Sequence, residues 1–537
     1  MRERRIESDA DLGALIEQST DIDAEVLQPL RLMFEAGAWV FVESAVADLP
    51  ADLRWLYESG AVTLEQLALL HDQLGATAVA DLSAAIDDGT IRTVRGLDDT
   101  VEPAVAAALR DLRHAVPRIP LGRAFGLVDP LLTHLRSLPG IEWALPVGSL
   151  RRGQDTVGDI ELVAAAGDPA AAIAAIFRLP DVDRWLYKSA RRLYLLINRI
   201  QIGMRFPEPV NAGSTLLHLT GSAAHFQGLR TRAAERGWRL TSEGLHTSDG
   251  ALRMAESEDE VYTSLGLPFI PPEIRNGDGE IAAAEEGALP TLLTREDIRG
   301  DLHMHSVWSD GRDSIETMVG ACRDLGYEYI AITDHSPASG VAHTLTARNI
   351  KRQAEEIAGA RERFPDIAIL HGCEVDILPE GRLDFPDRVL EGFDIVLASL
   401  HHRSGDGPDQ LLRRYVTAMR HPLVTLITHP TNRLVPHRPG YDLDYDRLLE
   451  AAAETGTWLE IDGAPAHMDM DGALARRAIA AGATVAVDSD CHRADLLARH
   501  MQLGVMIARR GWVEARQVAN TRPLADLRAL IARKRAG

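Results

Sequence analysis

Cysteine is scarce in this 537-residue chain, which has only Cys322, Cys373 and Cys491 and no C-x-x-C pair. This excludes a disulfide framework and fits a reducing cytoplasm. Long apolar runs are also missing, because no stretch of about 18 apolar residues occurs, and this excludes a membrane-spanning helix. The first residues are basic and then acidic without an apolar core, which excludes a secretory signal. We therefore expect a cytoplasmic protein with no membrane partner.

Positive charge is limited as well, since the net charge is −22 and residues 1–115 contain no lysine. Proteins that bind mainly the DNA backbone usually carry a basic surface, so this balance argues mildly against tight, non-specific nucleic-acid binding. One segment reverses the trend, with six basic residues and no acid: Arg184, Lys188, Arg191, Arg192, Arg199 and Arg205. This basic island predicts either an anion-binding surface or an ordinary solvated face.

The residue pattern changes along the chain, which predicts a multidomain protein. Residues 1–115 have apolar residues at three- and four-residue spacing, which predicts a helical domain. Residues 116–272 mix helices with alternating strands, and residues 273–298 read as a linker with a short helix. Residues 299–537 hold seven short apolar runs separated by helices: 299–303, YIAITDH, IAILHGCEVDI, FDIVLASLHH, LVTLITHP, TWLEID and TVAVDSDCH. This alternation is typical of a parallel βα barrel with its site at the carboxyl ends of the strands.

The stretch TVGDIELVAA places Asp159 and Glu161 two residues apart at the start of an apolar run. Residues two apart on a strand share a face, so the two carboxylates point together while Ile160 and Leu162 lie behind them. Such a pair supplies part of the ligand set of a divalent-metal site for phosphate chemistry, and a third acid is needed to complete that set.

Histidines and acids gather at the ends of the barrel strands. The candidate metal ligands are His303, His305, Asp310, His335, Glu374, His401, His429, Asp490 and His492. Mixed imidazole and carboxylate ligands suit Zn²⁺, Mn²⁺ or Fe²⁺ better than Mg²⁺ or Ca²⁺. Nine ligands suffice for two or three metal ions if one carboxylate bridges, and Glu374 is the candidate bridge. Clustered cations suit phosphoester hydrolysis, and amide hydrolysis is the alternative chemistry.

Five other histidines are expected at the surface or behind the ligands: His371, His402, His421, His437 and His467. His402 is ambiguous, because it neighbours His401 in the sequence.

The barrel segments DLHMHS, ITDHS, GCEVDIL, ASLHHR, THPTNRL and DSDCHR resemble, in order, the motifs of the PHP (polymerase and histidinol phosphatase) superfamily. The preceding stretches GSLRRGQDTVGDIE, HLTGSAAHFQGLR and EVYTSLGLPFIPPEIRNGDGEI resemble bacterial family X DNA polymerases. This resemblance implies a helical N-terminal domain, an α+β nucleotidyltransferase-like (family X palm) middle and a C-terminal distorted (β/α)7 PHP barrel. It also implies that all nine candidates bind a trinuclear metal site with 3′–5′ exonuclease or related DNA-repair phosphoesterase activity.

Within the polymerase-like part, the resemblance assigns triphosphate binding to Gly148, Ser149 and Arg152 and catalysis to Asp159. Glu161 stands where the family has a second aspartate. Gly203, in QIGMR, stands where the family has the third carboxylate. Losing that acid is expected to cost most of the polymerase rate, because it completes the shell of the catalytic metal and accepts the proton of the attacking hydroxyl.

Other family features are altered too. The aromatic YFTGS segment reads HLTGS at residues 218–222. The helix-hairpin-helix loops keep Gly60 and Gly96 but not their partner glycines, and Asp98 and Asp99 stand where DNA phosphate is expected. The N-terminus shows no lysine-rich 5′-phosphate pocket.

Four functions follow from these observations. The first is a DNA-repair protein with a metal-dependent 3′–5′ exonuclease or 3′-end-processing activity and a weak or lost polymerase activity, acting on DNA ends or gaps. The second is a working gap-filling polymerase with an attached nuclease, in which Asp159 and Glu161 hold Mg²⁺ or Mn²⁺, water replaces the third acid, and nucleotides are a further ligand class. The third is a small-molecule phosphatase, and the fourth is a non-catalytic DNA-end or partner-binding scaffold.

Overall fold

A computed structural model describes residues 60–536, apart from 78, 115–117, 180–181, 199, 342 and 404, together with residues 53, 56 and 57. The chain divides into two compact units, Met1–Pro117 with Asp168–Phe206 and Arg118–Gly167 with Pro207–Gly537. Within the described residues, no helix has both the length and the apolar composition needed to cross a membrane.

Short helices pack around a leucine-rich core in the first unit, as the spacing of apolar residues predicts. Their bounds are α5 Leu64–Leu74, α6 Val79–Asp87, η1 Thr90–Thr93 and α7 Val101–His114. α5 begins at a capping box, because Thr63 Oγ1 accepts a hydrogen bond from the Gln66 amide (3.2 Å) and Gln66 Oε1 accepts one from the Thr63 amide (2.8 Å). The expected helical stretch LRWLYESG and the residues before it lie mostly outside the described residues.

The first unit also holds α10 (Pro169–Ile176) and an antiparallel meander of three strands. The strands are β5 Arg184–Lys188, β6 Arg192–Ile197 and β7 Ile200–Arg205. Along β7, Ile200, Ile202, Gly203 and Met204 are buried, while Gln201 and Arg205 are half-buried.

The second unit starts with mixed helices and strands. Its elements up to residue 298 are β1 Ile119–Pro120, α8 Leu121–Ser137, β2 Ile141–Pro146, α9 Gly148–Arg151, β3 Thr156–Val157, β4 Ile160–Ala166, η2 Pro209–Asn211, α11 Ala212–Thr220, α12 Ala223–Glu235, β8 Arg239–Leu240, β9 Leu245–His246, β10 Leu252–Arg253, α13 Glu258–Ser264, η3 Pro272–Ile274, α14 Glu280–Glu285 and η4 Arg295–Asp297. β2 pairs with β4, β1 with β3, and β8 to β10 form a small sheet, all antiparallel.

The segment 273–298, expected to be a linker with a short helix, contains the short helix α14 but is packed against its surroundings. Ile274, Arg275, Glu280 and Leu293 are all buried. Tyr262 and Arg275 are among the largest fully buried side chains of the described residues, and the Arg275 guanidinium lies 5.3 Å from the centre of the Tyr262 ring. The segment therefore belongs to a core and is not a flexible spacer.

Seven parallel strands, joined in sequence order, confirm the barrel predicted for the C-terminal segment. They are β11 Gly300–Asp301, β12 Tyr329–Ile332, β13 Ala368–Asp376, β14 Ile395–Ser399, β15 Leu426–Ile427, β16 Trp458–Asp462 and β17 Val485–Asp488. Strands β12, β14, β16 and β17 are buried along their whole length, as expected of parallel strands covered on both faces.

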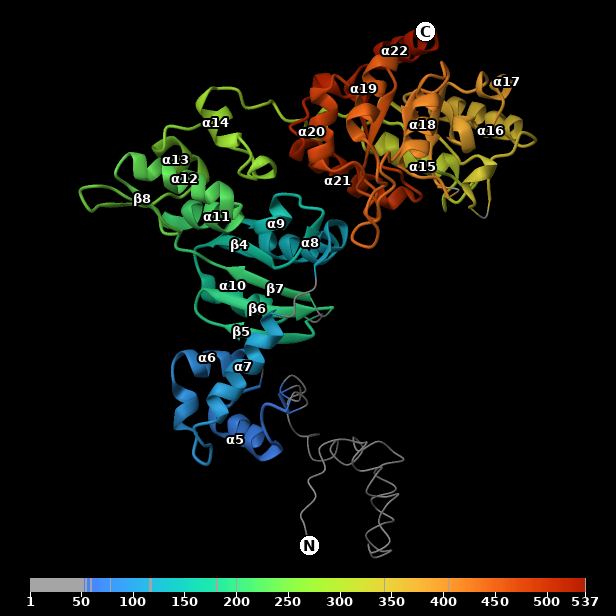
Figure 1. Cartoon of the computed structure of the whole chain (residues 1–537). Helices are drawn as coiled ribbons and strands as arrows, with labels where there is room; N and C mark the ends of the chain where they lie inside the picture. The colour runs from blue at the N-terminus through green and yellow to red at the C-terminus, as the bar shows by residue number, and fades with distance from the viewer. Residues whose placement is uncertain are drawn as a thin grey trace, which may run out of the picture. The chain divides into compact units, whose positions relative to one another are not determined.

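Helices follow most barrel strands and cover the barrel, drawn yellow to red in Figure 1. They are α15 Ile315–Asp324, α16 Ile350–Arg363, α17 Asp387–Leu390, α18 Pro408–Met419, α19 Tyr445–Thr455, α20 Gly472–Ala480, α21 Leu497–Arg510 and α22 Leu524–Ala536. Single 3₁₀ turns lie between them: η5 Pro337–Ser339, η6 Pro379–Gly381, η7 Ala494–Leu496, η8 Ala515–Gln517 and η9 Ala519–Thr521. The two outer strands approach each other at one end, where the His305 amide donates to the Cys491 carbonyl (2.9 Å) and the Leu302 amide donates to Asp488 Oδ1 (2.8 Å). The barrel is therefore nearly closed where β11 and β17 end.

Candidate metal centre

The nine predicted ligands converge at the carboxyl ends of the barrel strands. Each follows, or lies near the end of, one of six strands, and a parallel barrel directs such positions to one mouth. Two of them, His429 (φ 25°) and Asp490 (φ 44°), have left-handed backbone conformations that residues other than glycine rarely adopt. Residues held in such strained conformations cluster at functional sites.

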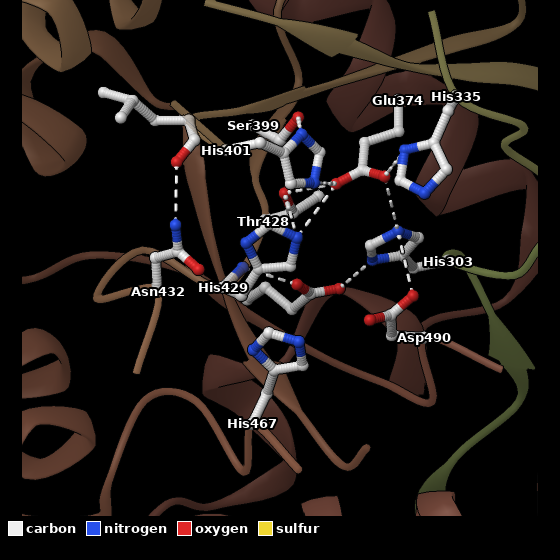
Figure 2. A network of polar contacts seen from close by, with 12 residues as sticks. His303, His335, Glu374, Ser399, His401, Thr428, His429, Asn432, His467 and Asp490 are labelled. Atoms are coloured by element: carbon white, nitrogen blue, oxygen red, sulfur yellow. Dashed lines mark hydrogen bonds and ion pairs between the residues drawn. The ribbon is translucent and has the colours of Figure 1, made fainter. Parts of the chain in front are cut away.

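Glu374 stands at the middle of this arrangement (Figure 2). Its Oε2 lies 2.7 Å from His335 Nδ1 and 3.5 Å from His303 Nε2. Its Oε1 lies 2.9 Å from His429 Nε2 and 3.6 Å from His401 Nε2. A single carboxylate thus faces four imidazoles with two oxygens, which is the geometry expected of a bridging ligand.

Three overlapping groups of side chains have the proximity that a metal ion requires. They are His305, Asp310, His335 and His492; His303, His305 and Asp490; and His335, Glu374 and His401. Within each group the candidate ligand atoms all lie within 4.8 Å of one another. The ninth residue, His429, joins them through Glu374. The clusters are consistent with a multi-metal PHP-type site.

Buried polar atoms at the same place fit bound cations. Asp310 Oδ1, His335 Nδ1, Glu374 Oε2 and His429 Nδ1 are buried and make no well-aligned hydrogen bond, although Glu374 Oε2 and His335 Nδ1 face each other at 2.7 Å and Asp310 Oδ1 lies 3.3 Å from His492 Nε2. Leaving such groups unpaired in a protein interior costs about 1–3 kcal/mol each, and more when they are charged. Metal coordination satisfies these lone pairs, so the residues present fit the cations that their chemistry implies.

The electrostatics of the cluster point the same way. Burial would raise the pKa of Glu374, but the neighbouring His335, His303 and His401 hold this pKa well below its usual range. Burial, together with His335 and His492, lowers the pKa of His305 to about 3, so its ring is neutral and keeps a lone pair for a cation. Burial lowers the pKa of His492, but Asp310 and Asp490 outweigh it and raise that pKa to about 9. The carboxylates therefore favour positive charge at the barrel mouth. Protons or metal ions can supply that charge.

Two further carboxylates orient ligand imidazoles from behind, and sequence reasoning did not single them out. Glu460, on β16, accepts a hydrogen bond from His303 Nδ1 (2.6 Å) through Oε1 and one from the His429 amide (2.6 Å) through Oε2. Asp376, at the end of β13, lies 3.1 Å from His401 Nδ1. Each contact leaves the Nε2 atom of the histidine directed at the cluster. Asp376 ends β13 and could have been noted from its place in GCEVD, whereas Glu460 lies in the middle of β16 and gave no such signal.

The five histidines expected outside the ligand set take several positions. His467 stacks on the His429 ring with centroids 5.5 Å apart (Figure 2). His371 contacts Gln353 (2.9 Å), and His421 contacts Asp387 (3.3 Å). His437 is exposed. His402 turns away to the Ser339 carbonyl (3.1 Å) and is in none of the three groups found among the described residues.

The polymerase-like residues lie elsewhere in the chain. Asp159 is exposed just before β4, and Glu161 is half-buried within that strand. α9 begins at Gly148 (φ 61°) and Ser149, and the Arg152 guanidinium that follows donates to the Gly221 carbonyl (2.9 Å) in the HLTGS turn. Gly203 lies on β7 of the first unit, where its register partner is Tyr194.

The features expected of eroded DNA contacts are only partly described. Gly60 and Gly96 both have positive φ, as tight turns require. Asp98 caps the start of α7, because its carboxylate accepts from the Thr100 amide (2.9 Å). In the basic island, Arg191 donates to the Phe206 carbonyl (3.0 Å) and Lys188 lies 4.5 Å from the Phe177 ring centre, while Arg199 is outside the described residues. The island is thus partly engaged within its own unit.

Two family models match the sequence, "DNA polymerase beta thumb" over residues 215–276 and "PHP domain" over residues 301–462. The "DNA polymerase/3′-5′ exonuclease PolX" of Bacillus subtilis (strain 168) is 34% identical over 508 residues, which are 94% of this chain and 89% of that protein. A "probable phosphatase" of Caldanaerobacter subterraneus subsp. tengcongensis is 34% identical over 206 residues, 36% of this chain and 75% of that protein.

Among solved structures, a Leishmania infantum polymerase beta ternary complex matches 40% of this chain and 94% of its own, at 16% identity and a TM-score of 0.27. The family assignment rests on the sequence relationships instead. Similarity to the Bacillus subtilis protein extends through nearly all of both chains, and the PHP model falls on the barrel that carries the clustered ligands. The chain belongs to the PolX family of DNA polymerase/3′-5′ exonucleases with a C-terminal PHP domain.

Proposed function

We propose that the barrel is a metal-dependent phosphoesterase that removes nucleotides from DNA 3′ ends, and that the polymerase activity of the chain is weak or lost. The observation that carries this proposal is the convergence of nine imidazoles and carboxylates at one barrel mouth. DNA is the proposed substrate because the full-length relative is named a DNA polymerase/3′-5′ exonuclease.

The nine side chains would hold two or three ions of Mn²⁺, Zn²⁺ or Fe²⁺, which their mixed nitrogen and oxygen ligands favour. When bound, such ions supply Lewis acidity that activates water and withdraws charge from the scissile phosphate. Glu374 would bridge two ions. Glu460 and Asp376 act as positioning residues, since they fix the orientations of the His303 and His401 rings.

The proposal for the polymerase half rests on Gly203. A glycine offers no carboxylate at the β7 position where the family has its third acid, and Asp159 and Glu161 alone make an incomplete shell for a catalytic metal. This part of the chain then serves to position DNA.

The nuclease proposal is tested with the purified full-length chain, Mn²⁺ and a 5′-labelled oligonucleotide. The unaltered protein is expected to shorten the strand from its 3′ end. The double variant His303→Ala/Asp490→Ala is expected to abolish shortening, whereas Arg528→Ala, which replaces an exposed arginine of α22, keeps it. Undiminished shortening by the double variant would rule out the barrel as the nuclease.

The second candidate is a working gap-filling polymerase, favoured by the presence of Asp159 and Glu161 at β4 and by the name of the full-length relative. Here Mg²⁺ or Mn²⁺ would bind these two acids, and water would take the place of the third. Primer extension on a gapped duplex separates the two candidates. We expect little or no extension from the unaltered chain and a gain from Gly203→Asp, while efficient extension by the unaltered chain refutes the loss.

A third candidate, hydrolysis of small phosphomonoesters, is favoured by the relatives named probable phosphatases, which match 206 residues, or 36% of this chain. Turnover of nucleoside monophosphates, compared with shortening of oligonucleotides by the same preparation, decides between these substrate classes. Preferred shortening of oligonucleotides is the result expected from the proposed function.

A further inference from the structure

An open cleft of ≈ 660 Å³ lies beside the metal centre in the second unit. One wall is the loop that follows His429, from Thr431 to Tyr441. The starts of α19 and α20 form further walls, and Asp155 and Thr156, just after the GSLRRG segment, complete the lining. Its volume falls in the range of about 300–1,000 Å³ that is usual for small-ligand sites.

The wall of the cleft is connected to two predicted ligands, through the backbone after His429 and through a hydrogen bond next to His401. Thr431 lies two residues beyond His429 and donates from Oγ1 to Asp469 (2.8 Å). Asn432 donates to the carbonyl of Leu400, the residue before His401, at 3.1 Å (Figure 2). The same amide donates to the Tyr441 hydroxyl (2.6 Å). The wall of the cleft is therefore held by residues next to two strand ends of the metal cluster.

The chemistry of the lining suits a nucleotide. Three arginines (Arg433, Arg438 and Arg477) and two aspartates (Asp155 and Asp471) contribute its charge, within a chain of net charge −22. Tyr441, Tyr445, Leu434, Val435, Pro436 and Pro439 contribute aromatic and apolar surface. Guanidinium groups recognise phosphate, and aromatic or apolar faces accept a base.

Arg438 differs from the other two arginines in its partners. Arg433 is paired with Asp155 (2.7 Å), and Arg477 with Asp446 (2.6 Å). Arg438 is exposed, donates from Nε and Nη2 to Asn432, and has no ion-pair partner among the described residues. Its positive charge is therefore not neutralised by a neighbouring acid and is available to an anion entering the cleft.

We propose that this cleft binds a nucleotide unit of the strand whose 3′ end lies at the metal centre, with Arg438 as the phosphate ligand and Tyr445 as part of the wall for the base. This inference rests on the proposed nuclease function and extends it, because it names the subsite that retains a DNA strand during cleavage. A bound phosphate would replace the water around Arg438 and leave the ion pairs of Arg433 and Arg477 in place.

The test compares two substrates on the full-length chain with Mn²⁺, an oligonucleotide and the small diester bis(p-nitrophenyl) phosphate. Arg438→Ala is expected to raise KM for the oligonucleotide about tenfold, the loss typical of one charge-assisted contact, with kcat nearly unchanged. Turnover of the small diester is expected to stay the same, because that substrate has no second nucleotide unit to place in the cleft. Arg438→Lys, which keeps the charge, is expected to give an oligonucleotide KM between those of the unaltered chain and Arg438→Ala. Arg528→Ala, which replaces an exposed arginine of α22, is expected to leave the kinetics with both substrates unchanged.

An unchanged oligonucleotide KM for Arg438→Ala, with normal turnover of the small diester, overturns the subsite and leaves the proposed function intact. If the unaltered chain cleaves neither substrate, the proposed function fails, and the cleft is then tested by calorimetric titration of EDTA-treated protein with thymidine 5′-monophosphate. Binding that Arg438→Ala weakens supports the subsite, and equal or absent binding in both proteins refutes it.

Discussion

Glu460 offers a sharp test of how the cluster is built, because its two oxygens serve two different donors. Oε1 accepts from His303 Nδ1 and Oε2 accepts from the His429 amide, both at 2.6 Å, and the side chain is fully buried. Glu460→Gln keeps the shape but has only one oxygen. If that oxygen stays with the His429 amide, the new NH₂ group faces His303 Nδ1 and forces it to accept.

The consequence for His303 can be worked out from its tautomers. An imidazole that accepts at Nδ1 carries its proton on Nε2, and Nε2 is the atom directed at Glu374 and Asp490. Such a ring cannot coordinate a cation through Nε2. If the amide flips, its NH₂ instead faces the His429 N–H, which leaves that backbone donor buried without an acceptor. Loss of a carboxylate partner of this kind typically costs 10- to 100-fold in metal affinity, or about 1.4–2.7 kcal/mol.

The measurement is a titration of EDTA-treated protein with Mn²⁺ or Zn²⁺, followed by calorimetry and by metal analysis after dialysis. We expect Glu460→Gln to lose affinity by the stated factor. Glu391→Gln, an exposed residue just after α17, is expected to match the unaltered chain. Equal affinity and stoichiometry in the Glu460 variant would refute the orienting role.

Three predictions concern stability. Glu258→Gln is expected to lower the free energy of unfolding by about 3–5 kcal/mol in urea, since buried Glu258 holds Arg275 (2.5 Å) and Arg151 (2.7 Å) and its loss leaves unpaired buried cations; a loss below 1 kcal/mol contradicts this. Burial would raise the pKa of Asp155, but the neighbouring Arg510 and Arg433 outweigh burial and lower this pKa. The stabilisation that the Asp155 carboxylate contributes is therefore complete above the unfolded pKa of about 3.9. It is lost as the pH falls through the lower pKa of the folded state. Asp155→Asn is therefore expected to flatten the dependence of the unfolding free energy on pH below about pH 4, and an unchanged profile opposes the assignment. Gly213→Ala is expected to lower the melting temperature, because the new methyl would lie 2.2 Å from the Ser257 carbonyl carbon. Gly126→Ala, at an exposed position of helix α8 with open space around it, is expected to raise the melting temperature slightly. Equal shifts in the two variants count against this packing argument.

The barrel and its ligand cluster could be predicted because two simple rules act together there. Parallel strands buried on both faces read as short apolar runs, and polar residues at their ends share one mouth. Asp490 and His492 follow β17, and His335 follows β12. Their positions in the sequence were therefore enough to predict that they lie at the barrel mouth. No information about side-chain direction was needed.

Residues that act through another side chain were beyond the sequence. Glu460 lies inside a buried strand, and its role depends on facing His303, which is 157 positions away in the chain. Likewise, Arg151 was part of a motif, but its partner Glu258 is 107 positions away. Segment 273–298 looked like a linker because Gly and acids are frequent in it, whereas tertiary contacts bury Arg275 and Glu280. Composition reports the local preference of a segment and not the partners that the fold supplies.

The turn after the GSLRRG segment connects two parts of the second unit that carry different chemistry. Asp155 is bound by Arg433 of the loop that follows His429 and by Arg510 of α21, and Gln154 accepts from Arg510 (3.0 Å). The segment that follows GSLRRG therefore also forms a wall of the cleft beside the metal cluster. If polymerase chemistry is weakened at Gly203, this wall still gives the polymerase-like segment a physical task, because it holds Arg433 in place and bounds the path that we propose for the DNA strand.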